Sequence, residues 1–542
     1  MMRKAICIPA ALLLLVSCNS FLEEHPRDQK TEGEVVTDAK NLYLATLGNL
    51  YSLFGGTEDS QGIQGTYRGL YDFNTFTTDE ALIPTRGGDW YDGGFWQRLY
   101  LHTWEAGDSY LNATWNYLYK VIVMANRSLQ TVAEAGKSGM IGSEEEASLT
   151  AEIRAVRAYF YYYLLDMFGR VPIVDRLDAN MNSLTQSSRS EVFNFVRNEL
   201  LESLPSLSPQ KSNVRGEYYG RMTRPVALFL LAKLSLNASV WLDDDWTDGK
   251  GATAPFSLTV FGETFTDPMD AVITLCKELS SYQYVLEENY QTNFDVYNEG
   301  SRENILTIPM DKQTLRTQNQ NIFRSRHYDH AAAVGGCGEN GSSATLEAIR
   351  SYPEGDLRLN INYWTGAATD LSGAQVYLST GEPLVYQPLS VALDLTGSPD
   401  EKIAGARMKK YVPDPNAAKD GKLMDNDIVI FRYADVLLMA AEAKVRKGMD
   451  GRAEINAVRT RAGIAPLENV TLDDILAERL REFAWEGLRR QDLIRFGAFT
   501  RPYSFRPVLP DEENGFTTVF PIPSNALTLN PNLTQNYGYE DE

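Results

Sequence analysis

The sequence predicts a mainly α-helical protein, in which a tetratricopeptide-like scaffold of paired helices carries a large, irregular, loop-rich insert. Apolar residues recur at helical spacing in several segments of about 15 to 20 residues, joined by short turns. Helix pairs follow one another at roughly 35 residues, which fits tetratricopeptide-type repeats. Glycine, asparagine and aromatic residues gather instead at about 55–95 and 285–430, where no helical period holds.

Residues 1–17 have the pattern of an export signal. Arg3 and Lys4 precede an apolar run over 5–16, which is too short to span a bilayer as a mature helix. Leu15-Val-Ser-Cys18 resembles the lipobox of bacterial lipoproteins, in which the cysteine becomes the lipidated first residue. The alternative is an ordinary signal peptide that happens to contain a cysteine. We expect Cys18 to carry lipid and to tie the mature chain to a membrane.

Charge and aromatic content narrow the kinds of ligand. The whole chain has a net charge of -21, which argues against nucleic acid and against adhesion to anionic lipid. It also contains 29 tyrosines and 8 tryptophans. Aromatic faces with polar edges bind sugar rings well, although most aromatic residues of any protein pack in its core.

The helical segments follow one another along most of the chain. The first is predicted over 41–54, where Leu42, Leu47 and Leu50 share one face. Helix then dominates from 96 to 283, the irregular stretch 285–430 interrupts it, and helices return within 432–497. Because no Pro/Ser-rich linker divides the chain, we expect residues 18–542 to form one domain. The predicted segments are 115–126, 149–168, 190–204, 223–240, 269–281, 434–447, 451–462 and 472–490.

The stretch 432–497 is dense in paired charges and small residues. Glu478, Glu482 and Glu486 lie on one helical stripe because they are four residues apart. Two carboxylates one turn apart could form an acid/base pair or a metal site. No histidine stands beside them, however, so we predict buried Glu–Arg pairs that cross-link helices. The available arginines are Arg459, Arg461, Arg479 and Arg489.

This stretch resembles the SusD/RagB family of outer-membrane nutrient-binding lipoproteins, and further motifs extend the resemblance over nearly the whole chain. Each motif is short, but they occur in the family's order. They are Phe21-Leu-Glu-Glu-His-Pro26, Thr78-Asp-Glu80, Glu152-Ile-Arg-Ala-Val-Arg-Ala-Tyr159, Phe168-Gly-Arg-Val-Pro172 and Phe520-Pro-Ile-Pro523.

The resemblance implies a non-catalytic protein, lipid-anchored through Cys18 and facing outward from the outer membrane. Such a protein captures oligosaccharide on its loop-rich face and serves as a lid on a SusC-like TonB-dependent transporter. It implies no cofactor and no nucleic-acid partner. Two alternatives remain within reach of the sequence: a peptide-binding RagB-like receptor, and a surface glycoside hydrolase with an opposed Asp/Glu pair. A helical-repeat scaffold that binds only protein would leave the aromatic loops unexplained.

The best candidate for a ligand site is the segment 85–96. It contains Trp90, Tyr91 and Trp96 among glycines, with Asp79 and Arg86 nearby as hydrogen-bonding groups. A stacked ring flanked by charged groups suits a sugar. Trp96 could equally begin the next helix and pack inward.

A second candidate surrounds Trp364, which follows Asp356 and Arg358 in the sequence. Cys337, in the loop Gly335-Gly-Cys-Gly338, and Arg407 could complete a pocket there.

Metal binding is not predicted. His327 and His330 could form a metal pair, but no third ligand is evident, so a surface turn is the better interpretation. The acidic run 243–248 lacks the spacing of a calcium-binding loop, because Ala254 occupies the twelfth position.

Overall fold

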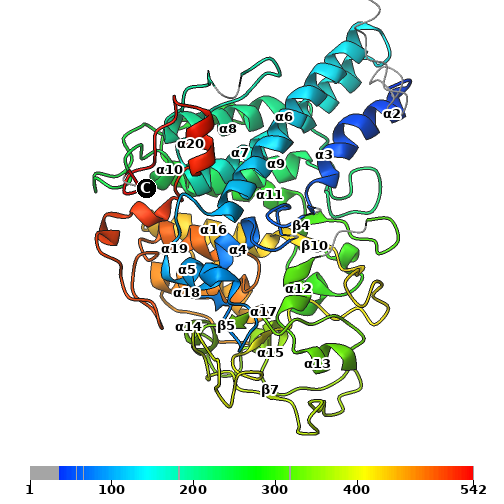
Figure 1. Ribbon diagram of the computed structural model, residues 1–542. Helices are drawn as coiled ribbons and strands as arrows, with labels where there is room; N and C mark the ends of the chain where they lie inside the picture. Colours follow the sequence, from blue (N-terminus) through cyan, green and yellow to red (C-terminus); the bar gives the residue numbers. More distant parts are fainter. Residues whose placement is uncertain (1–35, 57, 65, 181–182, 316–318, 541–542) are drawn as a thin grey trace, which may run out of the picture.

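The computed structural model describes residues 36–540, apart from 57, 65, 181–182 and 316–318 (Figure 1). It is mainly helical, and each sheet in this part of the chain has only two strands. The predicted export signal and Cys18 lie outside the described residues. No helix within the described ranges combines the length and apolar character needed to cross a membrane.

The scaffold is a series of helices, most of which pack on the next along the chain; α11 packs instead on α9. Five of the nine begin where a side-chain cap or an N-terminal proline satisfies or removes the first backbone donors, whereas α7, α10, α16 and α17 have neither. Asp108 caps α6, Ser188 forms a capping box with Glu191 at α8, and Asp267 precedes Pro268 in α11. The contact between α11 and α16 joins the two halves of the scaffold across the insert. These helices are α6 (Ser109–Lys137), α7 (Ser143–Phe168), α8 (Arg189–Ser203), α9 (Arg224–Leu236), α10 (Ala238–Trp241), α11 (Pro268–Ser281), α16 (Tyr433–Arg446), α17 (Arg452–Arg461) and α18 (Leu472–Glu482).

The first predicted helix forms in three consecutive pieces: α2 (Ala39–Tyr43), the π-helical turn η2 (Leu44–Gly48) and α3 (Asn49–Ser52). Leu42, Leu47 and Leu50 are fully buried, as their spacing predicts. This segment packs on α6, so the start of the described chain is fixed to the scaffold.

The prediction of one helix over 472–490 is wrong. The chain leaves helical geometry after Glu482, passes through positive φ at Trp485 (66°) and Gly487 (69°), and resumes as α19 (Arg489–Arg495). The buried ammonium of Lys410 accounts for the break, because it hydrogen-bonds the carbonyl oxygens of Glu482 (3.2 Å) and Ala484 (2.6 Å). A continuing helix would use those carbonyls itself.

The insert is built from short elements, which lie in the lower part of Figure 1, below the long helices. Strands β4 (Asn304–Ile308) and β10 (Ile428–Arg432) pair antiparallel and are buried along their whole length. Because β10 leads directly into α16, this ladder attaches the insert to the scaffold. The smaller pieces include α12 (Gln320–Arg324), α13 (Tyr328–Ala333), β5 (Ser343–Ala344), β6 (Tyr363–Trp364), β8 (Val385–Tyr386) and β9 (Arg407–Met408).

Buried carboxylates and arginines join the insert to the C-terminal helices. Arg432 contacts Glu303, Glu482 and Glu486 at 2.5 to 2.9 Å, and all four side chains are at most 3 % exposed. Arg358 and Arg461 also reach Glu482. We call the whole set the carboxylate–arginine network; its members are Glu303, Asp356, Arg358, Arg432, Arg461, Glu478, Glu482 and Glu486.

The predicted Glu–Arg cross-links are thus confirmed, with two changes of partner. Arg459 pairs with Glu478 and Arg461 with Glu482. Arg479 instead pairs with Asp435 and Asp492, and Arg489 pairs with Asp79. Asp435 lies on α16 and Asp492 on α19, so Arg479 joins α18 to both of these helices, whereas Arg489 lies beyond the helix break.

Candidate ligand-binding face

Trp90, in the predicted ligand loop, is held in place by several contacts. Its indole Nε1 donates a hydrogen bond to the carbonyl oxygen of Glu339, at 3.0 Å. The ring rests on the backbone at Gly341, where a Cβ atom would lie only 2.7 Å from it. The rings of Tyr67 and Trp96 contact it at centroid distances of 6.1 and 6.0 Å. As a residue, Trp90 remains half-buried.

Polar groups stand around this ring. Tyr91 is 60 % exposed, and Tyr328 is 48 % exposed and donates a hydrogen bond to Asp89 at 3.1 Å. The side chain of Glu339 is half-buried, and no described residue donates a hydrogen bond to its carboxylate. Burial raises the pKa of Glu339 to about 7, and the nearby charge of Lys422 lowers it. A half-desolvated carboxyl group without a partner is poised to bind hydroxyl groups of a ligand.

Four other predicted site residues point into the protein. Trp96 is 1 % exposed and its indole donates to Asp92. Asp79 is paired with Arg489, whose Nε and Nη2 lie 2.7 Å from its two oxygens. Arg86 and Arg407 are also buried, and they donate to backbone carbonyls and to Ser343. Their direct contact with a ligand stays a prediction.

The residues of the second predicted pocket differ in how accessible they are to a ligand. Trp364 is half-buried, with the Lys409 ammonium 4.5 Å from its ring centroid. Cys337 is a free, half-buried thiol whose pKa is raised by burial. Asp356 and Arg358 are fully enclosed in the carboxylate–arginine network, which occupies both of their charges.

The prediction that His327 and His330 lie in a surface turn is wrong, because both side chains are buried. His330 shares a hydrogen bond with the hydroxyl of Tyr386 at 3.0 Å. Burial lowers the pKa of both histidines to about 4, so they are neutral at pH 7. Within the described ranges, no group of three or more His, Cys, Asp or Glu side chains is arranged to hold a metal ion.

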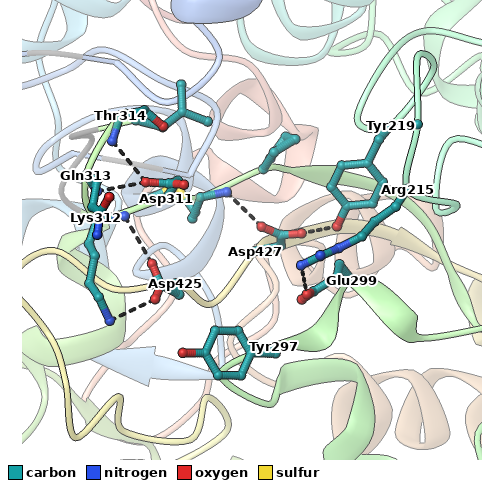
Figure 2. Close-up of a pocket in the computed structure, with 14 residues that line it drawn as sticks. Arg215, Tyr219, Tyr297, Glu299, Asp311, Lys312, Gln313, Thr314, Asp425 and Asp427 are labelled. Carbon is teal, nitrogen blue, oxygen red and sulfur yellow. Dashed lines mark hydrogen bonds and ion pairs between the residues drawn. The ribbon is translucent and has the colours of Figure 1, made fainter.

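A cavity of about 600 Å³ opens beside the β4–β10 ladder (Figure 2). Tyr297, 63 % exposed, stands at its edge, and Lys312 pairs with Asp425 at 2.8 Å on one side. On another side the Asp427 carboxyl accepts hydrogen bonds from the Tyr219 hydroxyl and from a backbone amide. Burial raises the pKa of Asp427 to about 6, although the Tyr219 hydrogen bond lowers it.

Sequence reasoning missed this cavity because its lining comes from four separated segments: 215–219, 297–299, 309–315 and 425–427. No single segment is unusual in composition. The cavity offers donors, acceptors and one exposed ring, a combination that suits a polyhydroxylated or peptidic ligand.

A helical scaffold that presents aromatic and polar groups on a loop-rich face suits ligand binding, and comparisons with known proteins identify the class. A model described as "SusD family" matches residues 392–539, and one described as "Starch-binding associating with outer membrane" matches residues 71–236. The chain belongs to the SusD/RagB family. This membership confirms the prediction that it is a non-catalytic binding protein.

Individual relatives resemble the chain over nearly its whole length. The starch-binding protein SusD of Bacteroides thetaiotaomicron is 24% identical over 575 residues, with 97% of this chain and 96% of that protein covered. A SusD-like protein of Bacteroides ovatus is 25% identical and covers 91% of this chain, which in turn covers 82% of it. A solved laminarin-binding SusD-like protein superposes with a TM-score of 0.70 at 21% identity, covering 93% of this chain and 100% of its own. These matches confirm the mainly helical fold.

Proposed function

We propose that the chain is a cell-surface lipoprotein that captures an oligosaccharide or polysaccharide and passes it to a SusC-like TonB-dependent transporter. The relatives support the ligand class, because SusD is named for starch binding and a structural neighbour was solved with laminarihexaose. The name of the second family model supports a place at the outer membrane. Lipid on Cys18 would hold the protein there, facing outward.

The observation that carries the proposal is the fixed Trp90 ring, whose indole is held by the backbone of Glu339, the residue with the unpartnered carboxyl group. A sugar ring presents a flat array of C–H groups that stacks on an aromatic face, and its hydroxyls hydrogen-bond at the edge. Because Trp90 is already held by Glu339 and Gly341, little side-chain entropy is lost on binding. A neighbouring carboxyl group accepts hydrogen bonds from sugar hydroxyls.

The paired charges of the Figure 2 cavity favour one alternative, a peptide ligand. Lys312 with Asp425 and Arg215 with Glu299 offer both signs of charge across one opening. A peptide brings an amine and a carboxylate that such groups could bind. The exposed ring of Tyr297 suits either ligand.

Binding of the mature protein to an oligosaccharide array and to a peptide library tests the proposed oligosaccharide ligand against the alternative peptide ligand. We expect oligosaccharide binding without product release, and at least a tenfold loss of affinity in Trp90→Ala, about 1.4 kcal/mol. Phe261→Ala is the matched control, because Phe261 is 54 % exposed in the hairpin between β2 (Leu258–Val260) and β3 (Glu263–Phe265). Unchanged affinity in Trp90→Ala would remove the loop from the site. Binding only to peptides, lost in Tyr297→Ala, would favour the alternative.

A further inference from the structure

The buried arginines of this protein fall into two groups. Most have a carboxylate partner; Arg324, for example, lies 2.6 Å from Asp72, and Arg490 lies 2.9 Å from Asp166. Arg86, Arg326 and Arg407 are equally buried, at 4, 1 and 0 % exposure. Yet within the described part of the chain no carboxylate forms an ion pair with any of these three. We call them the arginine cluster.

The three arginines converge on one place in the insert. Nη2 of Arg86 and Nη1 of Arg407 both donate to the hydroxyl oxygen of Ser343, at 2.8 and 3.1 Å. The Arg407 guanidinium also lies 5.3 Å from the ring centroid of Tyr386. The residue after Arg326, His327, donates its backbone amide to the Tyr386 hydroxyl at 3.1 Å. Charges from three separate segments are thus held around one tyrosine.

Arg326 is the member with most unused donors. Within the described residues, its Nε and Nη2 are buried without a hydrogen-bond partner, as is Nε of Arg407. The glycine loop 335–338 lies over the guanidinium, and a Cβ atom on Gly336 would come within 3.2 Å of Nη1. The backbone at Gly336 therefore lies directly against the guanidinium, and the Cys337 thiol of the same loop is near enough to interact with it electrostatically.

The balance of charge in this region is positive. Burial lowers the pKa of Arg326 and Arg407 to about 10, which reflects the cost of enclosing a cation without a counter-ion. Lys402 and Lys409 add positive charge nearby. Glu401 is the acid that interacts with Arg86, and one of its oxygens accepts the amide of Gly397. The whole chain has a net charge of -21, so a buried patch of positive charge stands out in it. Among the described residues, the patch lacks a paired negative group to balance it.

The arginine cluster continues directly into the Trp90 site. Arg86 and Trp90 belong to the same loop, and Nε of Arg86 lies 3.4 Å from the carbonyl oxygen of Gly341, the residue under the Trp90 ring. On the other side, the amide of Asn340 donates to the carbonyl oxygen of Arg326 at 2.7 Å. A ligand stacked on Trp90 would therefore have a substituent close to the cluster.

We propose that the arginine cluster is an oxyanion-binding subsite, which takes a carboxylate or sulfate group of an acidic oligosaccharide held on Trp90. The proposal rests on the proposed function and names its ligand class. Arginine presents parallel N–H donors that match both oxyanions, and these bonds are strongest when they are desolvated. The negative charge of the whole protein repels acidic glycans, so their capture requires a local cluster of the opposite sign.

An array of acidic and neutral oligosaccharides tests the proposal. We expect the strongest binders to carry carboxylate or sulfate groups, and to bind at least tenfold better than the same sugars without them. Arg326→Met should abolish that preference and leave the weaker, Trp90-dependent binding of neutral sugars. Its thermal unfolding temperature should equal or exceed that of the unmodified protein, because the substitution removes a buried, unpaired charge.

Matched controls separate the subsite from a general loss of structure. Arg189, at the start of α8, is another buried arginine that forms no ion pair with any described residue, and its guanidinium lies over the Trp246 ring. Arg189→Met should therefore keep the preference for acidic ligands. Should Arg326→Met fail to fold, Arg326→Lys and Arg407→Met provide the same comparison. Strongest binding by neutral oligosaccharides, or a preference that survives these substitutions, would overturn the proposal.

Sodium sulfate, added without any glycan, tests whether the arginine cluster binds a free anion. At millimolar concentrations, below those at which sulfate stabilises proteins in general, a sulfate-dependent rise in unfolding temperature that disappears in Arg326→Met and persists in Trp90→Ala supports the subsite, even if no glycan binds. In that case the proposed function fails and the anion site stands. A rise that persists in Arg326→Met would instead place the ion elsewhere and contradict the assignment.

Discussion

The carboxylate–arginine network and the arginine cluster both bury arginine side chains, but only the network surrounds them with carboxylates. Arg432 is enclosed by three carboxylates, whereas Arg326 is enclosed by none among the described residues. Removing one partner from a paired group leaves an uncompensated buried charge, which is strongly destabilising. Removing an unpaired charge relieves such a cost. The comparison teaches that burial of an arginine does not reveal its role, but the presence of its partner does.

The largest effect is expected from Arg432→Met in the network. The substitution leaves Glu303, Glu482 and Glu486 facing one another without their shared cation. We expect a loss of about 3 to 5 kcal/mol in the free energy of unfolding, measured by urea titration. A loss below about 1 kcal/mol would show that Lys410, Arg358 and Arg461 suffice, and the contrast with the arginine cluster would break.

Glu80 extends the comparison to a buried acid outside the network. Burial raises its pKa to about 8, against hydrogen bonding from the Trp485 amide and the charges of Lys410 and Arg489, which lower it. The folded protein therefore holds a proton that the unfolded chain releases near pH 4.5. This group's contribution to stability is complete below pH 4.5 and is lost as the pH rises through 8.

Glu80→Gln should remove that pH dependence, because the amide does not titrate. Each pKa unit corresponds to about 1.4 kcal/mol, so the difference amounts to a few kcal/mol at pH 9. Urea titrations at pH 5, 7 and 9 measure the free energy of unfolding of both proteins. As the pH rises, the variant should become more stable relative to the unmodified protein. Parallel pH profiles of the two proteins would show that Glu80 stays ionised when folded.

Gly341→Ala tests whether backbone packing, and not only chemistry, maintains the ligand face. The new Cβ atom would lie 2.7 Å from the Trp90 ring and displace it. We expect about a tenfold loss of oligosaccharide affinity, with a much smaller effect on unfolding than Arg432→Met. Gly88→Ala, in the loop that carries Trp90, is the control, because no described atom lies within 4 Å of its Cβ position. Equal affinities for both variants would mean that the exact place of the ring is unimportant.

The smallest effect is expected from Arg452→Met, which removes an exposed ion pair with Asp450 at the start of α17. Solvent already screens these two charges, so the urea midpoint should not change measurably. A clear loss would show that exposed pairs also hold the scaffold, and the distinction drawn from burial would need revision.

Local patterns in the sequence predict the scaffold well, because helical periodicity and capping residues act over a few positions. The spacing of Leu42, Leu47 and Leu50 and the stripe of Glu478 and Glu482 both give the observed buried faces. The break after Glu482 could not be predicted from such patterns. Its cause is Lys410, more than 70 positions away in the chain.

The ligand face is less predictable for the same reason. Trp90 stands out in the sequence, but the groups that fix its ring and surround it, at Glu339 and Gly341, come from a segment about 249 residues further on. Arg86 and Arg407 are recognisable as charged residues in loops. That both would be buried on Ser343 depends on contacts that no local spacing encodes.

The long separations within the carboxylate–arginine network also set an order of assembly. Arg432 reaches Glu303 across 129 positions, and Asn536 donates to the carbonyl of Phe168 across 368. Helices α6 to α9 contact neighbours close in the chain and can pair early, whereas the network must wait for residue 486. Until then, acidic and basic side chains destined for the interior stay hydrated and keep the unfinished chain soluble. The last tenth of the polypeptide therefore completes the molecule, and a nascent chain interrupted before it should be degraded rather than accumulate.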